Sequence, residues 1–223
     1  MKKTLATLAL AITATLNAGK VVQQTGPISF RMDTKSWNID YSKSVGAHPQ
    51  AAPVGWLFDF PTQPGLVGYV TQDVSGYAPV TTATTATALV ANIVIDASAD
   101  CAFDYHTNPD NTGNWPSSAR FYIESSWSNA DYVRWWATGT ACLVLADGRY
   151  QYTVPMEPQY WSDTWGHNGA GSAAAIDGWN KAMSAPRRIG FTFGGGSFYG
   201  HGVWLLQGSA SFNLQSINFV TAP

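Results

Sequence analysis

The sequence predicts an all-β fold, an antiparallel β-sandwich or jelly roll with one short connecting helix. Its 223 residues suit a single sandwich domain, and 45% of them are hydrophobic, enough for a substantial core. Trp, Tyr and Phe contribute ten residues each, whereas charged residues make up only 12%. Disordered chains lack such aromatics and coiled coils need far more Lys and Glu, so both classes are excluded.

Short segments with β-like alternation, separated by Gly, Pro, Asn and Asp, predict the strands. Within residues 119–124, Phe121 and Ile123 share one face, and the other face carries Arg120, Tyr122 and Glu124. Further strands are expected at residues 26–32, 66–72, 88–96, 133–138, 142–145, 150–154, 189–193 and 210–220. This number of short strands is typical of a sandwich.

Two local features refine this pattern. The alternation of the last strand slips by one residue between Leu214 and Ile217, which predicts a β-bulge near Gln215 and Ser216. Residues 172–185 follow a helical period, with Ser172 as the N-cap and a proline just after the segment as the stop. We expect this helix to pack on the outside of the sandwich as a connection.

The N-terminus has the layout of a signal peptide. Two lysines precede an uncharged apolar run at residues 4–16, and Ala14 and Ala18 are small residues suited to cleavage. The alternative is a buried N-terminal helix. The run of 13 residues is short for a membrane span, which needs roughly 20. We therefore expect a signal peptide at 1–18, one domain at 19–223, and a secreted or periplasmic protein.

The charge balance argues against nucleic acid as a partner. Cleavage after Ala18 removes two of the 12 basic residues and leaves 10 against 14 acidic ones, so the net charge changes from −2 to −4. Binding to a phosphate backbone needs clustered Lys and Arg, and the mature chain has only one adjacent pair, Arg187 and Arg188.

Two cysteines, Cys101 and Cys142, predict one disulfide in an exported chain. It would close a loop of about 40 residues and contribute about 3–4 kcal/mol on the chain-entropy model. The alternative is a pair of buried thiols. No Cys or His cluster predicts a metal site, and no cofactor is expected. One stretch offers oxygen ligands for a structural calcium ion: Asp100, Asp104, Asp110 and Asn111. The spacing of these residues matches no EF-hand and favours a solvated loop.

The C-terminal half carries the most distinctive motifs. These are Arg134-Trp135-Trp136, the segment Trp161-Ser162-Asp163-Thr164-Trp165-Gly166, and a glycine-rich run that ends in Gly200-His201-Gly202-Val203. On these motifs the chain resembles a family of uncharacterised secreted bacterial β-sandwich domains, over roughly residues 55–220. That family is similar to jelly-roll carbohydrate-binding modules. The resemblance implies fold and export, and it implies no reaction.

The aromatic residues of these motifs suggest sugar binding. Pyranose rings have apolar faces and polar edges, so rigid indole and phenol rings beside polar groups suit them. The candidate ligand-binding residues are Trp135, Trp136, Tyr160, Trp161, Asp163, Trp165, His167, Tyr199 and His201. Packing in the core is the competing interpretation for each Trp, since one of the neighbours Trp135 and Trp136 should face inward. The glycine run predicts a hairpin turn and no phosphate loop.

Three functions follow, in order of preference. The first is a non-catalytic domain that binds a polysaccharide or cell-surface glycan, and the second is a structural or adhesive extracellular protein. The third is a jelly-roll glycoside hydrolase, which needs two carboxylates at catalytic distance. The only two glutamates are Glu124 and Glu157, and Glu157 is expected in a turn.

Overall fold

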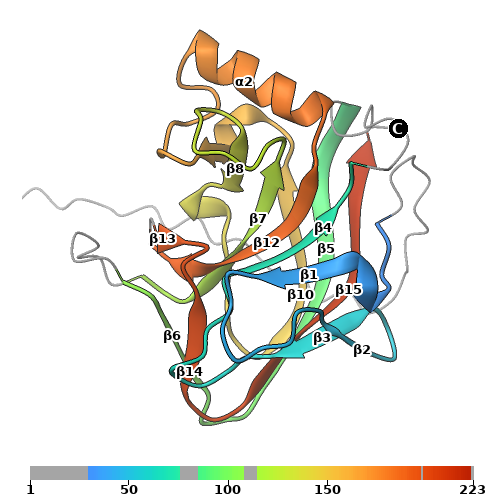
Figure 1. Cartoon of the computed structure of the whole chain (residues 1–223), viewed down its shortest axis with the longest axis vertical. Coiled ribbons are helices and arrows are strands. Elements are labelled where there is room, and N and C mark those ends of the chain that lie inside the picture. Colours follow the sequence, from blue (N-terminus) through green and yellow to red (C-terminus); the bar gives the residue numbers. More distant parts are fainter. Residues whose placement is uncertain (1–29, 76–84, 108–114, 197, 222–223) are drawn as a thin grey trace, which may run out of the picture.

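The computed structural model describes residues 30–75, 85–107, 115–196 and 198–221. The predicted signal peptide at 1–18 lies outside these residues, as does most of the strand expected at 26–32. The rest of the chain forms two facing antiparallel sheets, a separate two-stranded ribbon and a helix (Figure 1). The predicted antiparallel β-sandwich is therefore confirmed, whereas its jelly-roll topology stays a prediction.

The larger sheet has eight strands and carries the site described below. Six of them follow the order β1 (Trp37–Asp40), β4 (Tyr69–Asp73), β12 (Arg188–Gly195), β7 (Ser118–Glu124), β8 (Arg134–Ala137) and β11 (Trp161–Asp163). Two short strands extend it, β13 (Phe198–Tyr199) beside β12 and β9 (Leu143–Val144) beside β7.

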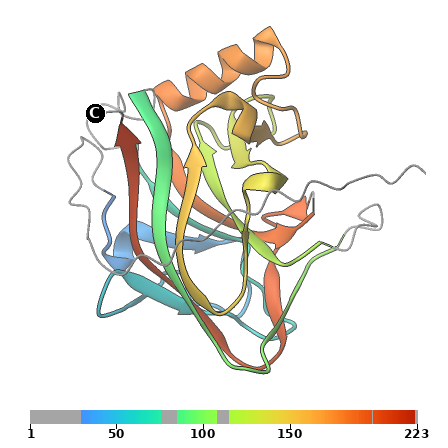
Figure 2. The same cartoon turned by 180° about the vertical axis from the view of Figure 1, so that it is seen from behind.

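The second sheet has five strands and faces the viewer in Figure 2. Its order is β10 (Gly148–Pro155), β5 (Ala86–Ala97), β15 (Ala210–Thr221), β3 (Trp56–Asp59) and β2 (Gln50–Ala51). The pairing of β15 with β5 shifts register between Leu214 and Ser216, which confirms the predicted bulge. The ribbon pairs β14 (Val203–Gln207) with β6 (Ala102–Tyr105).

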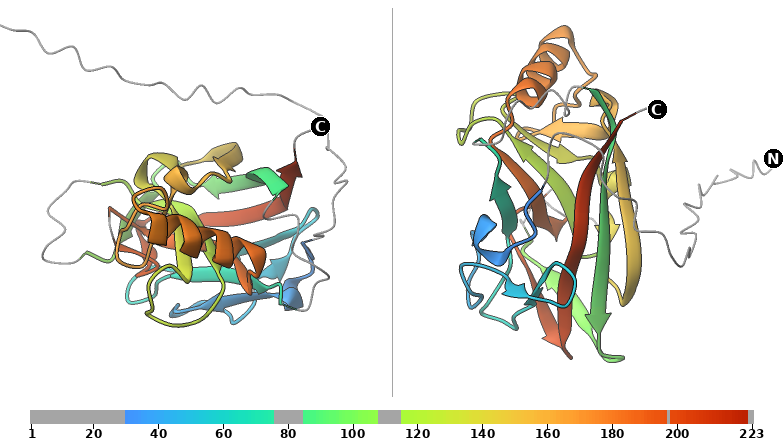
Figure 3. Two further views of the ribbon diagram at one scale, coloured as in Figure 1. Left: turned by 90° about the horizontal axis from the view of Figure 1, so that it is seen from above. Right: turned by 90° about the vertical axis from the view of Figure 1, so that its right-hand side faces the viewer.

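Aromatic rings from both sheets form the core between them, and Figure 3 shows the sheets as two layers. Phe121 of the larger sheet stacks on Tyr152 of the second at 4.4 Å between centroids. Phe191 meets Phe212 edge-on at 5.4 Å. Such rings bury 150–250 Å² each, so these contacts are the main source of cohesion between the layers.

The predicted helix is confirmed as α2 (Ala173–Ser184), which lies across one end of the molecule (Figure 1). The side chain of Ser172 caps it by accepting a hydrogen bond from the backbone N–H of Ala175 at 3.1 Å. Its buried Trp179 packs on Trp135 and Trp161, with ring centroids 5.3 and 5.2 Å away. Three short 3-10 helices complete the described elements: Thr34–Ser36, Gly139–Ala141 and Pro158–Tyr160. Within the described residues, no helix has the length and apolarity needed to cross a membrane.

The predicted disulfide is wrong, because both cysteines are free thiols. Cys101 lies in the turn between β5 and β6, where its backbone N–H donates to the carbonyl of Ser98. Cys142 lies just before β9 and packs against a cluster of aromatic side chains on the larger sheet. An even cysteine count specifies no geometry, and the fold places the two residues in different surroundings.

Candidate functional site

The larger sheet buries a second set of side chains on the face that points away from the core, here called the outer face. Its aromatic members are Tyr69 of β4, Tyr122 of β7, Trp136 of β8 and Tyr199 of β13, all at most 8% exposed. They follow from alternation along the strands, since Phe121, Ile123 and Trp135 fill the core side. The register brings Tyr122 opposite Trp136, and their rings lie 5.0 Å apart.

Two arginines share the outer face with these rings. Arg120 is 8% exposed, its guanidinium lies 3.2 Å from the ring centre of Tyr199, and it donates to the carbonyl of Gly196 at 2.8 Å. Arg134 is 7% exposed and donates to Asn129 Oδ1 at 2.5 Å. Stacking on an aromatic face and a carbonyl bond leave part of each guanidinium available to a further acceptor.

A cavity of about 610 Å³ opens on this face. Its described lining combines aromatic rings, the two arginines, small polar groups and glycines: Tyr69, Trp115, Arg120, Arg134, Trp136, Gly139, Ser162, Asp163, Thr164, Trp165, Gly166, Gly196, Tyr199 and His201. Trp115 and Trp165 are 52% and 58% exposed, so they form a rim of accessible indoles around the buried rings. A few convergent polar groups in an aromatic cleft are typical of a ligand site.

The glycine-rich run shapes one wall of the cavity. Gly196 turns the β12–β13 hairpin with φ of +61°, and its carbonyl accepts the bond from Arg120. Gly200 has φ of +80°, and a Cβ there would lie 2.5 Å from the ring of Tyr69. Only glycine suits both positions without strain, so the hairpin predicted from this run also positions Arg120 and the aromatic cluster.

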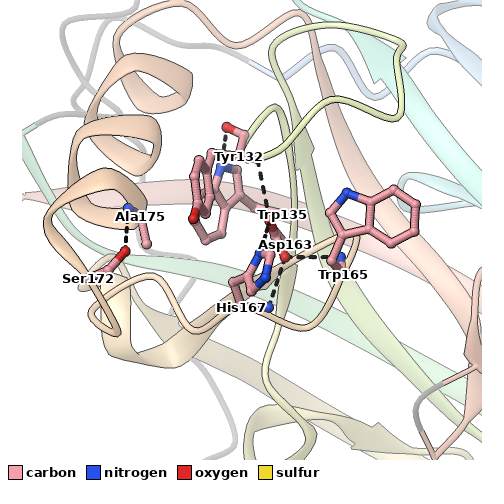
Figure 4. Close-up of polar contacts among 7 residues, drawn as sticks. All are labelled: Tyr132, Trp135, Asp163, Trp165, His167, Ser172 and Ala175. Atoms are coloured by element: carbon pink, nitrogen blue, oxygen red, sulfur yellow. Dashed lines mark hydrogen bonds and ion pairs between the residues drawn. The ribbon is translucent and has the colours of Figure 1, made fainter.

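Asp163 organises the opposite wall, as Figure 4 shows. Its fully buried carboxylate accepts from the backbone N–H groups of Trp165 at 2.9 Å and His167 at 2.8 Å, and it contacts His167 Nδ1 at 3.0 Å. It also accepts from the backbone N–H of Tyr132 at 3.4 Å. These bonds fix the turn after β11 and hold it to the loop before β8, with the Trp165 indole extending away from α2.

Glu124 lies deeper on the outer face and is 2% exposed. Tyr122 donates its hydroxyl to Glu124 Oε2 at 2.5 Å, and Arg188 Nε lies 4.0 Å from Oε1. Burial and the nearby Glu124 charge raise the pKa of Tyr122 far above its ordinary range. Burial raises the pKa of Tyr69 to about 12, against a lowering effect of Arg134. Both phenols therefore stay protonated and act as hydrogen-bond donors at neutral pH.

An exposed aromatic pair adjoins the cluster. Tyr41 and Trp127 stack at 5.0 Å between centroids, and Tyr69 lies 5.3 Å from Tyr41. Tyr41 holds φ of +51°, an unfavourable region for a residue with a side chain. Arg134 lies 5.0 Å from the ring centre of Trp127, so the pair also shields one side of that guanidinium.

Several buried polar atoms of the cavity have no hydrogen-bond partner among the described residues. They are Arg120 Nε, Arg134 Nε, Trp136 Nε1 and Thr164 Oγ1. Native proteins leave few such atoms, because each unsatisfied group costs about 1–3 kcal/mol. Three further atoms of this kind, Trp56 Nε1, Thr192 Oγ1 and Trp204 Nε1, belong to residues that do not line the cavity, so the unsatisfied atoms do not by themselves mark a ligand site.

The structure brings five of the nine predicted ligand-binding residues to the cavity: Trp136, Asp163, Trp165, Tyr199 and His201. Tyr160 is exposed outside it, and His167 supports the turn through Asp163. Trp135 and Trp161 were wrong as ligand contacts. Both are fully buried on the core side, where Trp179 of α2 covers them.

The pair of glutamates considered for hydrolysis is not brought together at the cavity. Glu157 lies in the turn after β10, is exposed, and accepts a hydrogen bond from Gln159 at 2.5 Å. Neither glutamate lines the cavity, and Asp163 is the one carboxylate among its described lining residues. No group of three or more potential metal ligands occurs in the described part of the chain. Of the calcium candidates, Asp110 and Asn111 lie outside it.

Sequence reasoning missed Arg120, Arg134, Tyr69 and Trp115 as site residues. One signal was present, because Arg120, Tyr122 and Glu124 repeat at every second position of a strand whose other face is apolar. Large polar and aromatic side chains in that pattern on β7, next to Arg134 and Trp136 on β8, indicate a second buried face of the sheet. No pattern of the sequence assigns Trp115 to this face, and Tyr69 was noted only as part of the family resemblance.

Comparison with protein-family models, curated proteins and solved structures finds no match to this chain.

Proposed function

We propose that this chain is a secreted, non-catalytic protein that binds a glycan in the outer-face cavity. The observation that carries the proposal is the composition of the cavity: exposed indoles of Trp115 and Trp165 lie beside buried rings and the guanidinium donors of Arg120 and Arg134. The apolar faces of sugars stack on such rings, and their hydroxyls accept from the donors. Export rests on the N-terminal sequence, and the resemblance to carbohydrate-binding modules agrees with this function.

The cavity size supports the same proposal. At about 610 Å³ it lies within the range of small-molecule sites, roughly 300–1,000 Å³, and can hold a short saccharide. Asp163, the one carboxylate among the described lining residues, accepts from three backbone N–H groups, so the lining lacks the pair of carboxylates that glycoside hydrolysis commonly uses. Binding without hydrolysis is therefore the activity that the arrangement favours.

The test is a glycan array probed with the chain that lacks residues 1–18, followed by titration of each hit while Trp fluorescence is recorded. We expect saturable binding that changes Trp emission and that weakens about tenfold or more in Trp165→Ala and Trp115→Ala. Leu206→Ala is the matched control, since Leu206 is 63% exposed and does not line the cavity. Absence of binding across diverse neutral and acidic glycans would refute the proposal.

A further inference from the structure

Two buried arginines of the cavity lack a carboxylate partner. No carboxylate of the described residues lies within 4.0 Å of the Arg120 or Arg134 guanidinium, although both side chains are more than nine-tenths buried. A buried charge without a counter-charge is costly. The Nε atom of each arginine also lacks a hydrogen-bond partner among the described residues.

The acidic groups nearby are already engaged. Asp40 and Glu124 lie 3.7 and 4.0 Å from Arg188, and Glu124 also accepts from Tyr122. Glu124 stands opposite Arg134 in the β7–β8 ladder, yet the Arg134 guanidinium bonds Asn129.

The cavity wall formed by the turn after β11 has no carboxylate that is available to pair with the two arginines. The Asp163 carboxylate is occupied by backbone N–H groups and His167. Burial and the neighbouring His106 lower the pKa of His201, which favours its neutral form. The cavity therefore presents a net positive lining.

We propose that the cavity selects an anionic glycan, whose carboxylate or sulfate groups pair with Arg120 and Arg134. This inference rests on the proposed glycan-binding function and names the ligand class. Arg120 is held ready for such a group, because Tyr199 covers one face of its guanidinium and Gly196 fixes one Nη2 hydrogen. The remaining N–H groups of its guanidinium are planar donors of the kind that bind carboxylate and sulfate.

The spacing of the two arginines favours a chain over a single acidic sugar. Arg134 pairs with Glu124 in the ladder, and Arg120 lies four residues further along β7, which is about 13 Å at a strand rise of 3.3 Å per residue. The Trp136 ring lies between these positions, opposite Tyr122. An oligosaccharide with acidic groups on more than one sugar can pair with both arginines while a neutral face stacks on Trp136.

The test compares acidic polymers with matched neutral ones. The uronate arm uses polygalacturonate, alginate and hyaluronan, with methyl-esterified polygalacturonate as the neutral partner. The sulfate arm uses dextran sulfate with dextran. We expect binding in one or both acidic arms, binding at least about tenfold weaker to the neutral partner, and affinity that falls as NaCl rises from 50 to 500 mM. The arm that binds identifies the anionic group.

Variants assign the effect to the arginines. Arg120→Gln should weaken binding of the acidic polymer about tenfold or more, and Arg120→Lys, which keeps the charge and loses the fork, should weaken it less. Arg149→Gln is the control, because Arg149 is exposed on β10 of the second sheet. Thermal unfolding of each variant verifies folding, and the salt dependence of the unmodified protein tests the inference even if a variant does not fold.

The outcomes separate the two proposals. Equal binding to acidic and neutral polymers, or salt-independent binding, overturns the anionic assignment and leaves glycan binding standing if Trp165→Ala still weakens it. Unchanged affinity in folded Arg120→Gln also overturns the assignment. Failure to bind any neutral or acidic glycan overturns both proposals.

Discussion

Burial of the Arg120 guanidinium costs free energy that its own contacts only partly offset. Withdrawing a guanidinium from water costs several kcal/mol, and stacking on Tyr199 with one bond to Gly196 returns only part of it. A hydrophobic residue of similar volume would avoid the charge at this position. The proposed anionic ligand would offset this cost, and it would do the same for Arg134, whose Nε has no hydrogen-bond partner among the described residues.

Tyr69 gives a pH-dependent prediction at the level of one side chain. Its pKa is raised to about 12 by burial, against 10 in the unfolded chain, so the folded protein holds this proton to higher pH. Its contribution to stability is complete below pH 10 and is lost as pH rises from 10 to 12, at about 1.4 kcal/mol per pH unit. We expect the free energy of unfolding to fall less steeply above pH 10 in Tyr69→Phe.

Urea unfolding at pH 9, 10 and 11 measures this difference. Burial also raises the pKa values of Tyr122 and Tyr152, which contribute to the pH dependence of both proteins in the same direction. Between pH 9 and pH 11, the free energy of unfolding of the unmodified protein should fall by about 1 kcal/mol more than that of Tyr69→Phe. Parallel curves over this range would show that Tyr69 titrates at its ordinary pKa.

Among the elements, the turn after β11 depends on one carboxylate. Asp163→Ala removes an acceptor from the backbone N–H groups of Tyr132, Trp165 and His167, which then lack their partner. We expect a loss of about 2–4 kcal/mol in the free energy of unfolding and weaker glycan binding, because Trp165 is no longer held at the rim. Chemical denaturation and the glycan titration measure the two effects.

The matched control for this variant lies on α2. Asp177 pairs with Lys181 at 2.6 Å, but both side chains are largely exposed, so Asp177→Ala should change stability by less than about 0.5 kcal/mol and leave binding intact. If Asp163→Ala behaves like this control, the turn is held by other contacts and Asp163 has no positioning role.

The elements that the sequence predicts well are long and alternate cleanly. The sequence pattern predicted strands β5, β7, β12 and β15 and helix α2, together with the bulge in β15 and the division of Trp135 and Trp136 between two faces. Among the strands of two to five residues, β4, β8 and β9 were predicted, whereas β2, β11 and β14 were not, because so few residues give a weak period. They form because tertiary pairing supplies the partners.

Five of the fourteen described residues that line the cavity were predicted from the sequence. Trp136, Trp165 and Tyr199 lie in conspicuous motifs, whereas Trp161 has the same motif context and faces the core. Its direction is decided by α2, whose Trp179 covers the end of the sheet, and this is a long-range packing event. The arginine pair emerges only when β7 and β8 are placed side by side in register.

At the scale of the whole molecule, the larger sheet is unusual for an antiparallel sandwich. One face of such a sheet commonly meets water, yet every residue of β7 and β8 is buried, on both faces. The second sheet and α2 cover the inner face, and loops with the β12–β13 hairpin border the outer one. The sandwich therefore provides a rigid floor, and the loops provide walls, which is the arrangement a binding site needs to hold its groups in place.

The free thiols lead to the last prediction, which concerns stability of the whole fold. A disulfide between Cys101 and Cys142 would contribute about 3–4 kcal/mol, so its reduction would lower the unfolding midpoint clearly. Because both cysteines are free, we expect a reductant to leave the urea midpoint of the purified protein unchanged. Replacement of both by serine should cost no more than about 1 kcal/mol, since both side chains are only partly buried. A large fall of the midpoint under reductant, matched by the double variant, would instead show that the purified protein forms the bond.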